Sequence, residues 1–561
     1  MKFIARSVAF ILLVVPSLLL VVRSLSGADE QADVARIIAA GRTNNQVMEH
    51  LDILCNRFGP RLTSSDNLQN ASEWARDTFA SFELESARLE EWGQFSVGFN
   101  RGPWFGRMVT PTEKPLHFGT NAWTAGTKGV QRGRAVFAPE SDEELDALRE
   151  KLPGAWVLMR RPGSTARPGV DFQNKVNAAF REAKIGGVVR SAAGELIHTF
   201  GSPPQSWDKL PTIPAVVLVK KEYDEIAELI KNGDEVTLEF DIRNYFKRGP
   251  VKLYNVIADL PGSEWPDEYV IVGGHIDSWD GATGAMDNGT GCAAVIEAAR
   301  ILKLAGVKPR RTIRFMLWSG EEQGLLGSIG YCNKNPDLMK KISAVLVDDG
   351  GTDYVSGIQA TAAMVSDFER VLAPIKDLDP KMPFTIQQVK GLPPMIGSDQ
   401  DAFLAKGVPG FYLKQAGGAN YNRIHHTQFD TYEGAIPEYQ KHSSIVIALC
   451  AVGIANLDQM VSRENLRAPG FTFPIARPAG RQIGVQLDGL KIGEVLDGSV
   501  AAKAGLKTDD EFVKVDGKNV SSREELVAEI QKGEPKKTVT ILRDGKELEL
   551  VLEWPKAETK N

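Results

Sequence analysis

The sequence predicts a large α/β domain that is split by a smaller inserted module and followed by a separate β-rich unit. Three observations lead to this prediction. Between residues 251 and 460, short apolar runs alternate with helical stretches, which is typical of an α/β sandwich whose strands are buried on both faces. Residues 130–247 instead contain short apolar runs that are separated by Pro- and Gly-rich turns. A Pro-containing stretch at 463–480 then precedes a last segment that has predicted strands of its own. At about 150 residues per domain, 561 residues suit roughly three domains.

The composition excludes several classes of protein. Hydrophobic residues make up 43% and charged residues 25% of the chain, close to globular averages, so a collagen-like, disordered or multi-span membrane chain is not expected. The formal net charge is −6, which gives no reason to expect a nucleic-acid partner. The four cysteines show no CxxC spacing and lie in apolar surroundings, so we expect buried free thiols at Cys55, Cys292, Cys332 and Cys450.

The N-terminus has the pattern of an export signal. Lys2 and Arg6 precede an apolar run over residues 7–22, and the small residues 26–28 follow it. About 16 apolar residues fall just short of a comfortable membrane span, so we favour a cleaved signal at 1–28. An uncleaved anchor remains the alternative interpretation. In both cases the protein is expected outside the cytoplasm, in the periplasm or secreted.

The main domain is predicted to be formed by residues 29–129 and 248–462. Helical periodicity predicts helices at 32–58 and 67–82 in its first part. In the second part, strands and helices alternate along the chain. The predicted strands are 254–258, 269–273, 312–318, 342–347 and 410–413, and the predicted helices are 292–304, 325–335, 368–372 and 437–457.

Residues 130–247 are predicted to form an inserted small α/β or β-rich module, since short apolar runs are separated there by Pro- and Gly-rich turns. After a linker at 463–480, residues 481–556 are predicted to form the C-terminal unit. Apolar runs at 483–487, 492–496, 512–517, 539–542 and 548–552 indicate its strands, and helices are expected at 501–506 and 523–531.

Residues able to bind a metal follow the predicted strands of the main domain. His275 and Asp277 come directly after a buried strand, and on extended backbone their side chains point the same way, so Asp277 can orient the imidazole. Further candidates are Asp287, which precedes a helix, the pair Glu321-Glu322 after the next strand, the pair Asp348-Asp349 after a third strand, and His425-His426 before the last long helix. Open α/β sheets place their sites at these strand ends.

Nitrogen and carboxylate ligands together suit zinc, and a carboxylate can bridge two ions. The sequence contains no Gly-x-Ser-x-Gly nucleophile elbow, no P-loop and no strand–GxGxxG–helix site. Hydrolysis by metal-activated water is therefore the chemistry that the residues favour.

Five motifs, in order, resemble those of the M28 family of co-catalytic zinc exopeptidases. They are His275-x-Asp277, Asp287-Asn-Gly-x-Gly291, Glu321-Glu322-x-Gly-x-x-Gly-Ser328, Asp349, and His426-Thr-x-x-Asp430-Thr431. The stretch 274–287 looks closest to the carboxypeptidase Q branch. Ser398-Asp399 with Phe403 is similar to the family's approach to the substrate pocket. The resemblance implies a three-layer α/β/α domain with a mixed central sheet. The insert looks like a β-rich protease-associated (PA) domain, and the tail resembles a bacterial PDZ domain.

The resemblance also implies a role for each matching residue. His275 and Asp349 would complete one zinc site, Glu322 and His426 the other, and Asp287 would bridge the two ions. Glu321 would be the general base and Asp277 the support of His275. The spacing within the motifs favours Asp349 over Asp348 and His426 over His425.

The resemblance implies an exported dizinc exopeptidase acting on dipeptides or short peptides, as a carboxypeptidase or dipeptidase. Aminopeptidase specificity is the first alternative. A glutaminyl-cyclase-like acyltransferase with one zinc and a receptor-like homologue without activity are the others. Peptide substrates are the expected partners, together with a C-terminal peptide on the PDZ domain. The oligomeric state stays open between a monomer and a homodimer.

Overall fold

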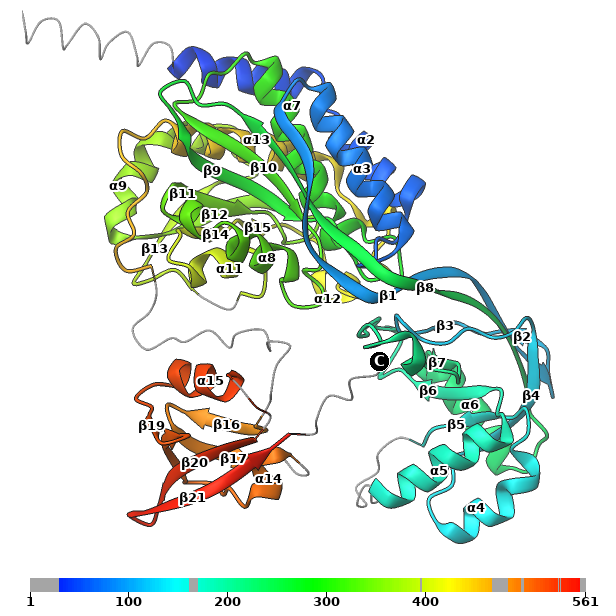
Figure 1. Cartoon of the computed structure of the whole chain (residues 1–561). Helices are drawn as coiled ribbons and strands as arrows, with labels where there is room; N and C mark the ends of the chain where they lie inside the picture. Colours follow the sequence, from blue (N-terminus) through cyan, green and yellow to red (C-terminus); the bar gives the residue numbers. More distant parts are fainter. Residues whose placement is uncertain are drawn as a thin grey trace, which may run out of the picture. The chain divides into compact units, whose positions relative to one another are not determined.

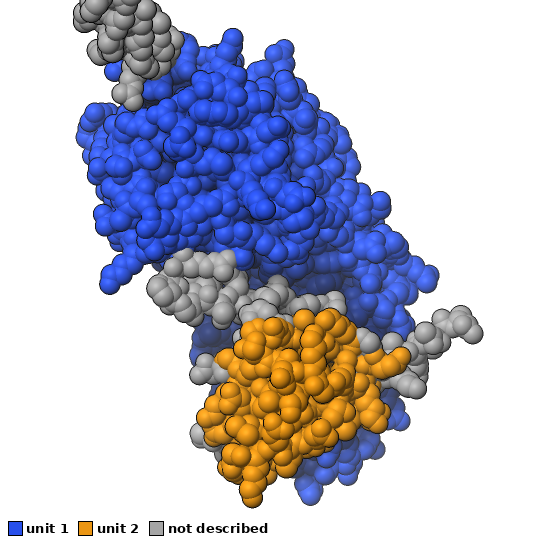
Figure 2. All heavy atoms as spheres, turned by 60° about the vertical axis from the view of Figure 1, so that its left-hand side comes forward, with its two compact units in different colours: residues 1–473 blue, residues 474–561 orange. Residues whose placement is uncertain are grey.

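The computed structural model describes residues 30–160, 170–393, 396–466, 483–495, 499–532, 534 and 536–554. The predicted signal at 1–28 and residues 467–480 of the predicted linker lie outside the described residues. The chain divides into two compact units, residues 1–473 and 474–561, coloured blue and orange in Figure 2. Within the described part of the chain, no helix has the length and apolar character needed to cross a membrane.

The centre of the first unit is a mixed sheet, as predicted. Its strand order is β14-β11-β9-β10-β8, and β1 pairs with β8 on the outer side. The first four strands are parallel, and β8 runs antiparallel to both β10 and β1. The bounds are β1 (Glu85–Thr110), β8 (Thr237–Leu260), β9 (Trp265–His275), β10 (Arg311–Trp318), β11 (Ile342–Val347) and β14 (Gly410–Tyr412).

Side chains alternate along these strands and bury apolar residues on both faces of the sheet. On one face, Ile313 and Phe315 of β10 pack with helices α2, α3, α7 and α13, whereas Met316 of the same strand packs with α8 and α11 on the other. The domain is therefore the expected three-layer sandwich, and Figure 1 shows this arrangement. The helices are residues 30–43, α2 (Val47–Asp52), α3 (Asp66–Ser81), α7 (Thr290–Leu304), α8 (Leu326–Lys334), α11 (Gln400–Ala405) and α13 (Pro437–Ala455).

Shorter elements complete this domain. A small second sheet has the order β13-β12-β15 and lies beside helix α9. The single helix predicted at 32–58 is instead three consecutive segments, because the chain breaks at residues 44–46 and the last turn widens into a π-helix. The remaining elements are η1 (Ile53–Phe58), η4 (Ala285–Gly289), η5 (Pro336–Lys340), β12 (Tyr354–Thr361), α9 (Ala362–Val371), α10 (Ala373–Lys376), β13 (Thr385–Val389), β15 (Lys414–Ala416), α12 (Tyr421–Ile424) and η6 (Tyr432–Gly434).

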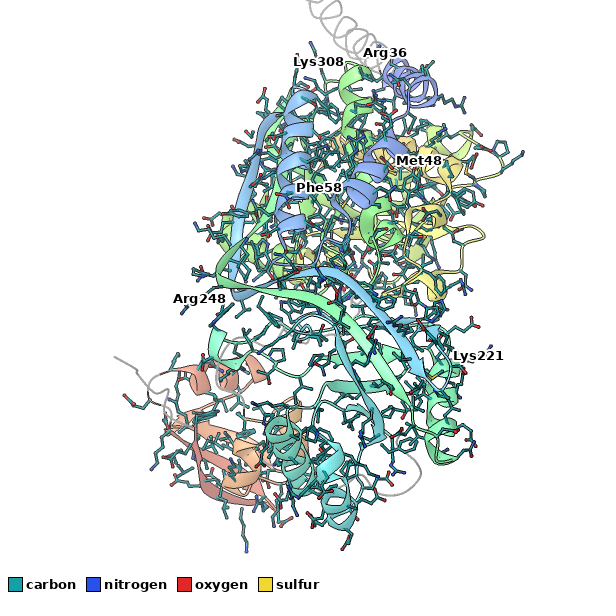
Figure 3. All side chains as sticks on the ribbon, turned by 90° about the vertical axis from the view of Figure 1, so that its right-hand side faces the viewer. Arg36, Met48, Phe58, Lys221, Arg248 and Lys308 are labelled. Carbon is teal, nitrogen blue, oxygen red and sulfur yellow. The ribbon has the colours of Figure 1, made fainter. Side chains whose placement is uncertain are left out.

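Strands β1 and β8 form a long two-stranded ribbon that leads from the central sheet into the insert. They pair from Glu85 opposite Asp259 to Thr110 opposite Thr237, with five register shifts along the way. In Figure 3, Arg248 marks this ribbon between the helices that carry Met48 and Phe58 and the insert that carries Lys221. One continuous pair of strands therefore joins the two parts of the unit.

The insert is a small α/β module, one of the two forms that its sequence predicts. Four parallel strands, β4 to β7, continue the sheet from β8, and β3 closes it antiparallel to β7. Two apolar clusters cover the two faces. Its elements are β2 (Lys114–Pro115), β3 (Phe118–Gly119), β4 (Gln131–Phe137), α4 (Asp142–Leu148), η2 (Arg149–Lys151), β5 (Trp156–Leu158), α5 (Val170–Ala183), β6 (Gly187–Ser191), η3 (Trp207–Lys209), β7 (Ala215–Leu218) and α6 (Lys220–Lys231).

The second unit has an apolar core of its own, and its main sheet is antiparallel with the order β16-β17-β18-β20-β21. Ser499 and Ser522 begin its helices by accepting hydrogen bonds from backbone N–H groups of the first turn. The elements are β16 (Val485–Asp488), β17 (Lys491–Val495), α14 (Val500–Ala504), β18 (Glu511–Val515), β19 (Lys518–Asn519), α15 (Arg523–Gln531), β20 (Lys536–Arg543) and β21 (Lys546–Glu553).

Candidate active site and metal centre

The predicted site residues meet at one edge of the central sheet. His275 is the last residue of β9, Glu321 and Glu322 follow β10, and Asp349 follows β11. These three strands are adjacent and parallel, so their carboxyl ends share an edge. Asp287 reaches the same place from η4, and His426 reaches it from the loop after α12.

The first cluster consists of His275, Asp287 and Asp349. Nε2 of His275 lies 3.2 Å from Oδ1 of Asp287 and 3.0 Å from Oδ1 of Asp349. One ligand atom from each residue lies within 4.8 Å of the others, which is close enough to share one ion. The other ring nitrogen, Nδ1, lies 3.0 Å from the backbone carbonyl of Asp277, and this contact fixes the orientation of the imidazole.

The second cluster lies on the other side of Asp287. Nε2 of His426 is 3.3 Å from Oδ2 of Asp287 and 3.1 Å from Oε2 of Glu322. The two carboxylate oxygens of Asp287 therefore face different histidines, as a carboxylate that bridges two ions would. His426 has a φ of 59°, unusual for a residue with a side chain, and the surrounding contacts must hold it there.

Asp348 and His425 are the alternatives to Asp349 and His426 as ligands, and their surroundings differ. Asp348 accepts a hydrogen bond of 2.7 Å from Nε2 of Gln415, and burial raises its pKa to about 7. His425 stacks on His426 with ring centres 3.7 Å apart, and its Nε2 lies 3.8 Å from Oδ2 of Asp287. His425, Asp287 and His426 also lie close enough to share one ion. His426 is the histidine that contacts both Asp287 and Glu322.

Asp277 contacts the imidazole of His275 through its backbone carbonyl, and its side chain has further partners. Its Oδ1 is 3.7 Å from Nδ1 of His275, too long for a hydrogen bond, because the backbone carbonyl of Asp277 takes that position. The carboxylate instead accepts hydrogen bonds from the backbone N–H groups of Glu321, at 3.2 Å, and Glu322, at 3.3 Å, and from the hydroxyl of Thr63, at 2.8 Å. Asp277 therefore positions the two glutamates as well as the histidine.

The electrostatics of the cluster are those of a buried excess of carboxylates. Burial raises the pKa of Glu321 well above its usual range; the positive field of His275 opposes this shift, and the carboxylate of Asp349 adds to it. Burial likewise raises the pKa of Glu322 to about 8. Burial also acts against the charged form of Asp287, but hydrogen bonds from His275 and His426 outweigh it and lower the pKa of Asp287. Divalent cations would neutralise such a group, and its imidazole and carboxylate donors fit zinc.

The site is also held together by residues that the sequence analysis does not identify. Arg61 is fully buried and donates hydrogen bonds to the carbonyls of Ile276, at 2.7 Å, and Gly284, at 2.7 Å, so it shapes the loop between His275 and Asp287. Tyr412 donates a hydrogen bond of 2.6 Å to the carbonyl of Asp349. These contacts join segments far apart in sequence, so spacing could not indicate them.

Asp430 of the motif His426-Thr-x-x-Asp430-Thr431 also makes a hydrogen bond that holds the site together. Its Oδ1 accepts a hydrogen bond of 2.6 Å from the N–H of Met286, next to Asp287. Trp279 also joins the site, because its backbone N–H lies 3.3 Å from Oε1 of Glu322. A recess beside Asp287 and Glu322 is lined by Trp279, Gly281, Ala282, His426, Thr427 and Asp430.

The chain is similar in sequence to known peptidases. The model of peptidase family M28 matches residues 255–450, and a PDZ domain model matches residues 491–543. Carboxypeptidase Q of Rattus norvegicus is 28% identical over 447 residues, which cover 77% of this chain and 91% of that protein. The human carboxypeptidase Q is 27% identical over 447 residues, with the same coverage.

Among solved structures, the peptidase M28 precursor from Shewanella amazonensis SB2B has the same fold. Its TM-score is 0.56 at 24% sequence identity, and the match covers 78% of this chain and 98% of that one. The fold agrees with the three-layer architecture found here.

Proposed function

We propose, from the premise that the chain is a carboxypeptidase Q-like metalloexopeptidase of peptidase family M28 with a C-terminal PDZ domain, that it hydrolyses dipeptides or short peptides at a site for two zinc ions. The observation that carries the proposal is the position of Asp287. Its two oxygens face His275 on one side and His426 on the other, and each histidine has a second carboxylate beside it, Asp349 or Glu322.

The roles proposed for the chain's residues follow from their positions. When bound, two zinc ions supply Lewis acidity and lower the pKa of an attacking water. His275, Asp349, Glu322 and His426 would hold the ions, with Asp287 between them. Glu321 would take the proton of the water and pass it to the amine that leaves.

A carboxyl group with a raised pKa suits this proton transfer, because the group must both accept and release a proton near neutral pH. The peptide N–H groups of Glu321 and Glu322 are both held by Asp277, so the base and the neighbouring ligand keep a fixed relation. This arrangement supports different roles for two adjacent glutamates.

Two hypotheses compete with a dizinc hydrolase. A glutaminyl-cyclase-like acyltransferase needs one zinc, and the two clusters around Asp287 favour a site for two. A receptor-like homologue without activity would lack ligands, whereas each of the five ligand positions carries a side chain able to bind zinc.

A panel of blocked and unblocked dipeptides tests the function. The zinc-loaded protein should hydrolyse free dipeptides. Hydrolysis of N-acetylated dipeptides would identify a carboxypeptidase, and hydrolysis of C-amidated dipeptides an aminopeptidase. Failure to hydrolyse any member, with zinc bound, would contradict the proposal.

We further propose that the PDZ domain binds an extended C-terminal peptide at β16. This strand is at the end of its sheet, so its outer edge can pair with an added strand, and the preceding Ile483-Gly484 segment leads into that edge. Export is proposed from the N-terminal pattern, with fractionation of the expressing cell as the test. A homodimer of the full chain is also proposed, and sedimentation of the full chain would measure it.

A further inference from the structure

A segment of the insert contacts the loop that carries His426. Residues 195–200 follow β6 of the insert. The N–H of Thr199 donates a hydrogen bond of 2.8 Å to the carbonyl of His426, and His198 pairs with Thr427 as an isolated antiparallel β-bridge. The side chain of Gln428 accepts a hydrogen bond from the N–H of Ile197 and donates one to the carbonyl of Glu195, both at 2.8 Å. The insert is therefore tied to this loop by several backbone contacts.

These contacts place the ring of Phe200 beside the metal centre. Its ring centre lies 5.4 Å from that of His426 and 6.1 Å from that of Trp279, and both pairs are edge-to-face. Trp279 and His426 are themselves 6.0 Å apart, so the three rings contact one another. The carbonyl of Phe200 accepts a hydrogen bond of 2.9 Å from the N–H of Ala122, which fixes the backbone from the other side.

Phe200 differs from its neighbours in its exposure. Trp279 is 7% exposed, whereas Phe200 is 49% exposed. The ring of His198 stacks parallel to the ring of Phe200, with the ring centres 6.0 Å apart. The exposed ring of Phe200 beside His426 is suited to contact an apolar group of a bound molecule, because that contact removes apolar area of both partners from water.

We infer that Phe200 is a specificity-determining residue, which forms one wall of the subsite for an apolar side chain of the peptide substrate. The inference rests on the proposed function, since it places the substrate at the ions beside His426. The insert then contributes directly to substrate choice, and Trp279 continues the same aromatic surface into the catalytic domain.

The test compares Phe200→Ala with the wild-type protein on Leu-Gly, Gly-Leu and Gly-Gly. We expect kcat/KM for at least one leucine-containing dipeptide to fall roughly 10-fold, the usual scale for losing apolar contact in a pocket, with Gly-Gly changed less than about 2-fold. The zinc content should stay that of the wild type. Phe200→Leu keeps an apolar surface and should restore most of the loss.

Phe105→Ala is the matched control, because Phe105 is 48% exposed and lies on β1, where its ring stacks against Arg107. It should leave all three rates unchanged. An equal loss on all three dipeptides, no loss on any, or a loss of zinc in Phe200→Ala would overturn the inference. If the wild-type protein hydrolyses none of the dipeptides, the proposed function fails instead.

Discussion

Replacing Arg101 tests how the ribbon holds the loop next to the metal centre. Arg101 lies on β1, and its Nη2 is 2.7 Å from Oδ1 of Asp280. The same nitrogen donates a hydrogen bond of 2.9 Å to the carbonyl of Thr120. Both charged side chains are only 3% exposed, and Asp280 directly follows Trp279, whose backbone N–H contacts Glu322. The ion pair therefore joins the ribbon to the loop that borders the site.

The burial of the pair sets the expected magnitude. Removing one partner of a buried ion pair leaves the other charge without compensation and typically costs about 3–5 kcal/mol. Unfolding entropy of about 2.1 cal/mol/K per residue gives roughly 1 kcal/mol/K for a unit of this size, so Tm should fall by about 3–5 °C. Arg101→Met and Asp280→Asn should each have this effect. The double variant should lose less than the sum, because neither buried charge remains.

Differential scanning calorimetry of the full chain measures these shifts in the transition of the first unit. Arg149→Met is the control, since its ion pair with Asp146 is well exposed and should contribute at most about 1 kcal/mol. If Arg101→Met shifts Tm no more than Arg149→Met does, the buried ion pair does not stabilise the first unit as expected. Strict additivity in the double variant would also refute this expectation, because it would mean that the two charges do not interact.

Three further predictions concern the base, pH and the tail. Glu321→Gln should lower kcat by roughly 10²–10⁴-fold and keep its zinc, whereas Glu322→Gln should lose zinc; kinetics with metal analysis would show the reverse if the roles are exchanged. Burial lowers the pKa of His442 from its usual 6.5 to about 4, so the unfolded chain binds the extra proton between these values, and stability should fall by up to about 3 kcal/mol as pH drops from 6.5 to 4. Denaturant unfolding of His442→Gln should show a weaker pH dependence, and an unchanged one would contradict this. A chain ending at Leu466, which packs in the main core, should keep peptidase activity within a few-fold; loss of folding and of zinc would make the tail part of the catalytic unit.

The strands that carry the site could be predicted from the sequence because they are buried on both faces. The apolar run at 342–347 has the bounds of β11, and the run at 312–318 differs from β10 by one residue. Since parallel strands place their carboxyl ends at one edge, the convergence of His275, Glu322 and Asp349 could also be expected. The family resemblance then supplied the roles that spacing alone left open.

The ribbon and its contacts could not be predicted in the same way. Residues 85–110 form β1, yet their sequence contains four glycines and one proline and lacks a clear alternation of apolar and polar residues. Each of the five register shifts of the ribbon changes the face on which the following side chains lie. The two-residue alternation of apolar and polar side chains that identifies a strand in a sequence is therefore lost.

The contribution of the insert to the site is also not visible in the sequence. Phe200 is more than 220 residues from His426 along the chain, and only the fold brings their rings together. Asp277 makes two kinds of contact. Its backbone carbonyl contacts the imidazole of His275, and its carboxylate accepts hydrogen bonds from the N–H groups of Glu321 and Glu322. Residue type and spacing do not distinguish these two contacts.

We propose that Asp287 lies between two zinc ions that act together in peptide hydrolysis. The most direct test is a zinc titration of the metal-free full chain, with bound zinc and dipeptide hydrolysis measured in the same samples. We expect about two zinc ions per chain, with full activity only after the second has bound. Full activity with a single bound ion, or with none, would contradict it.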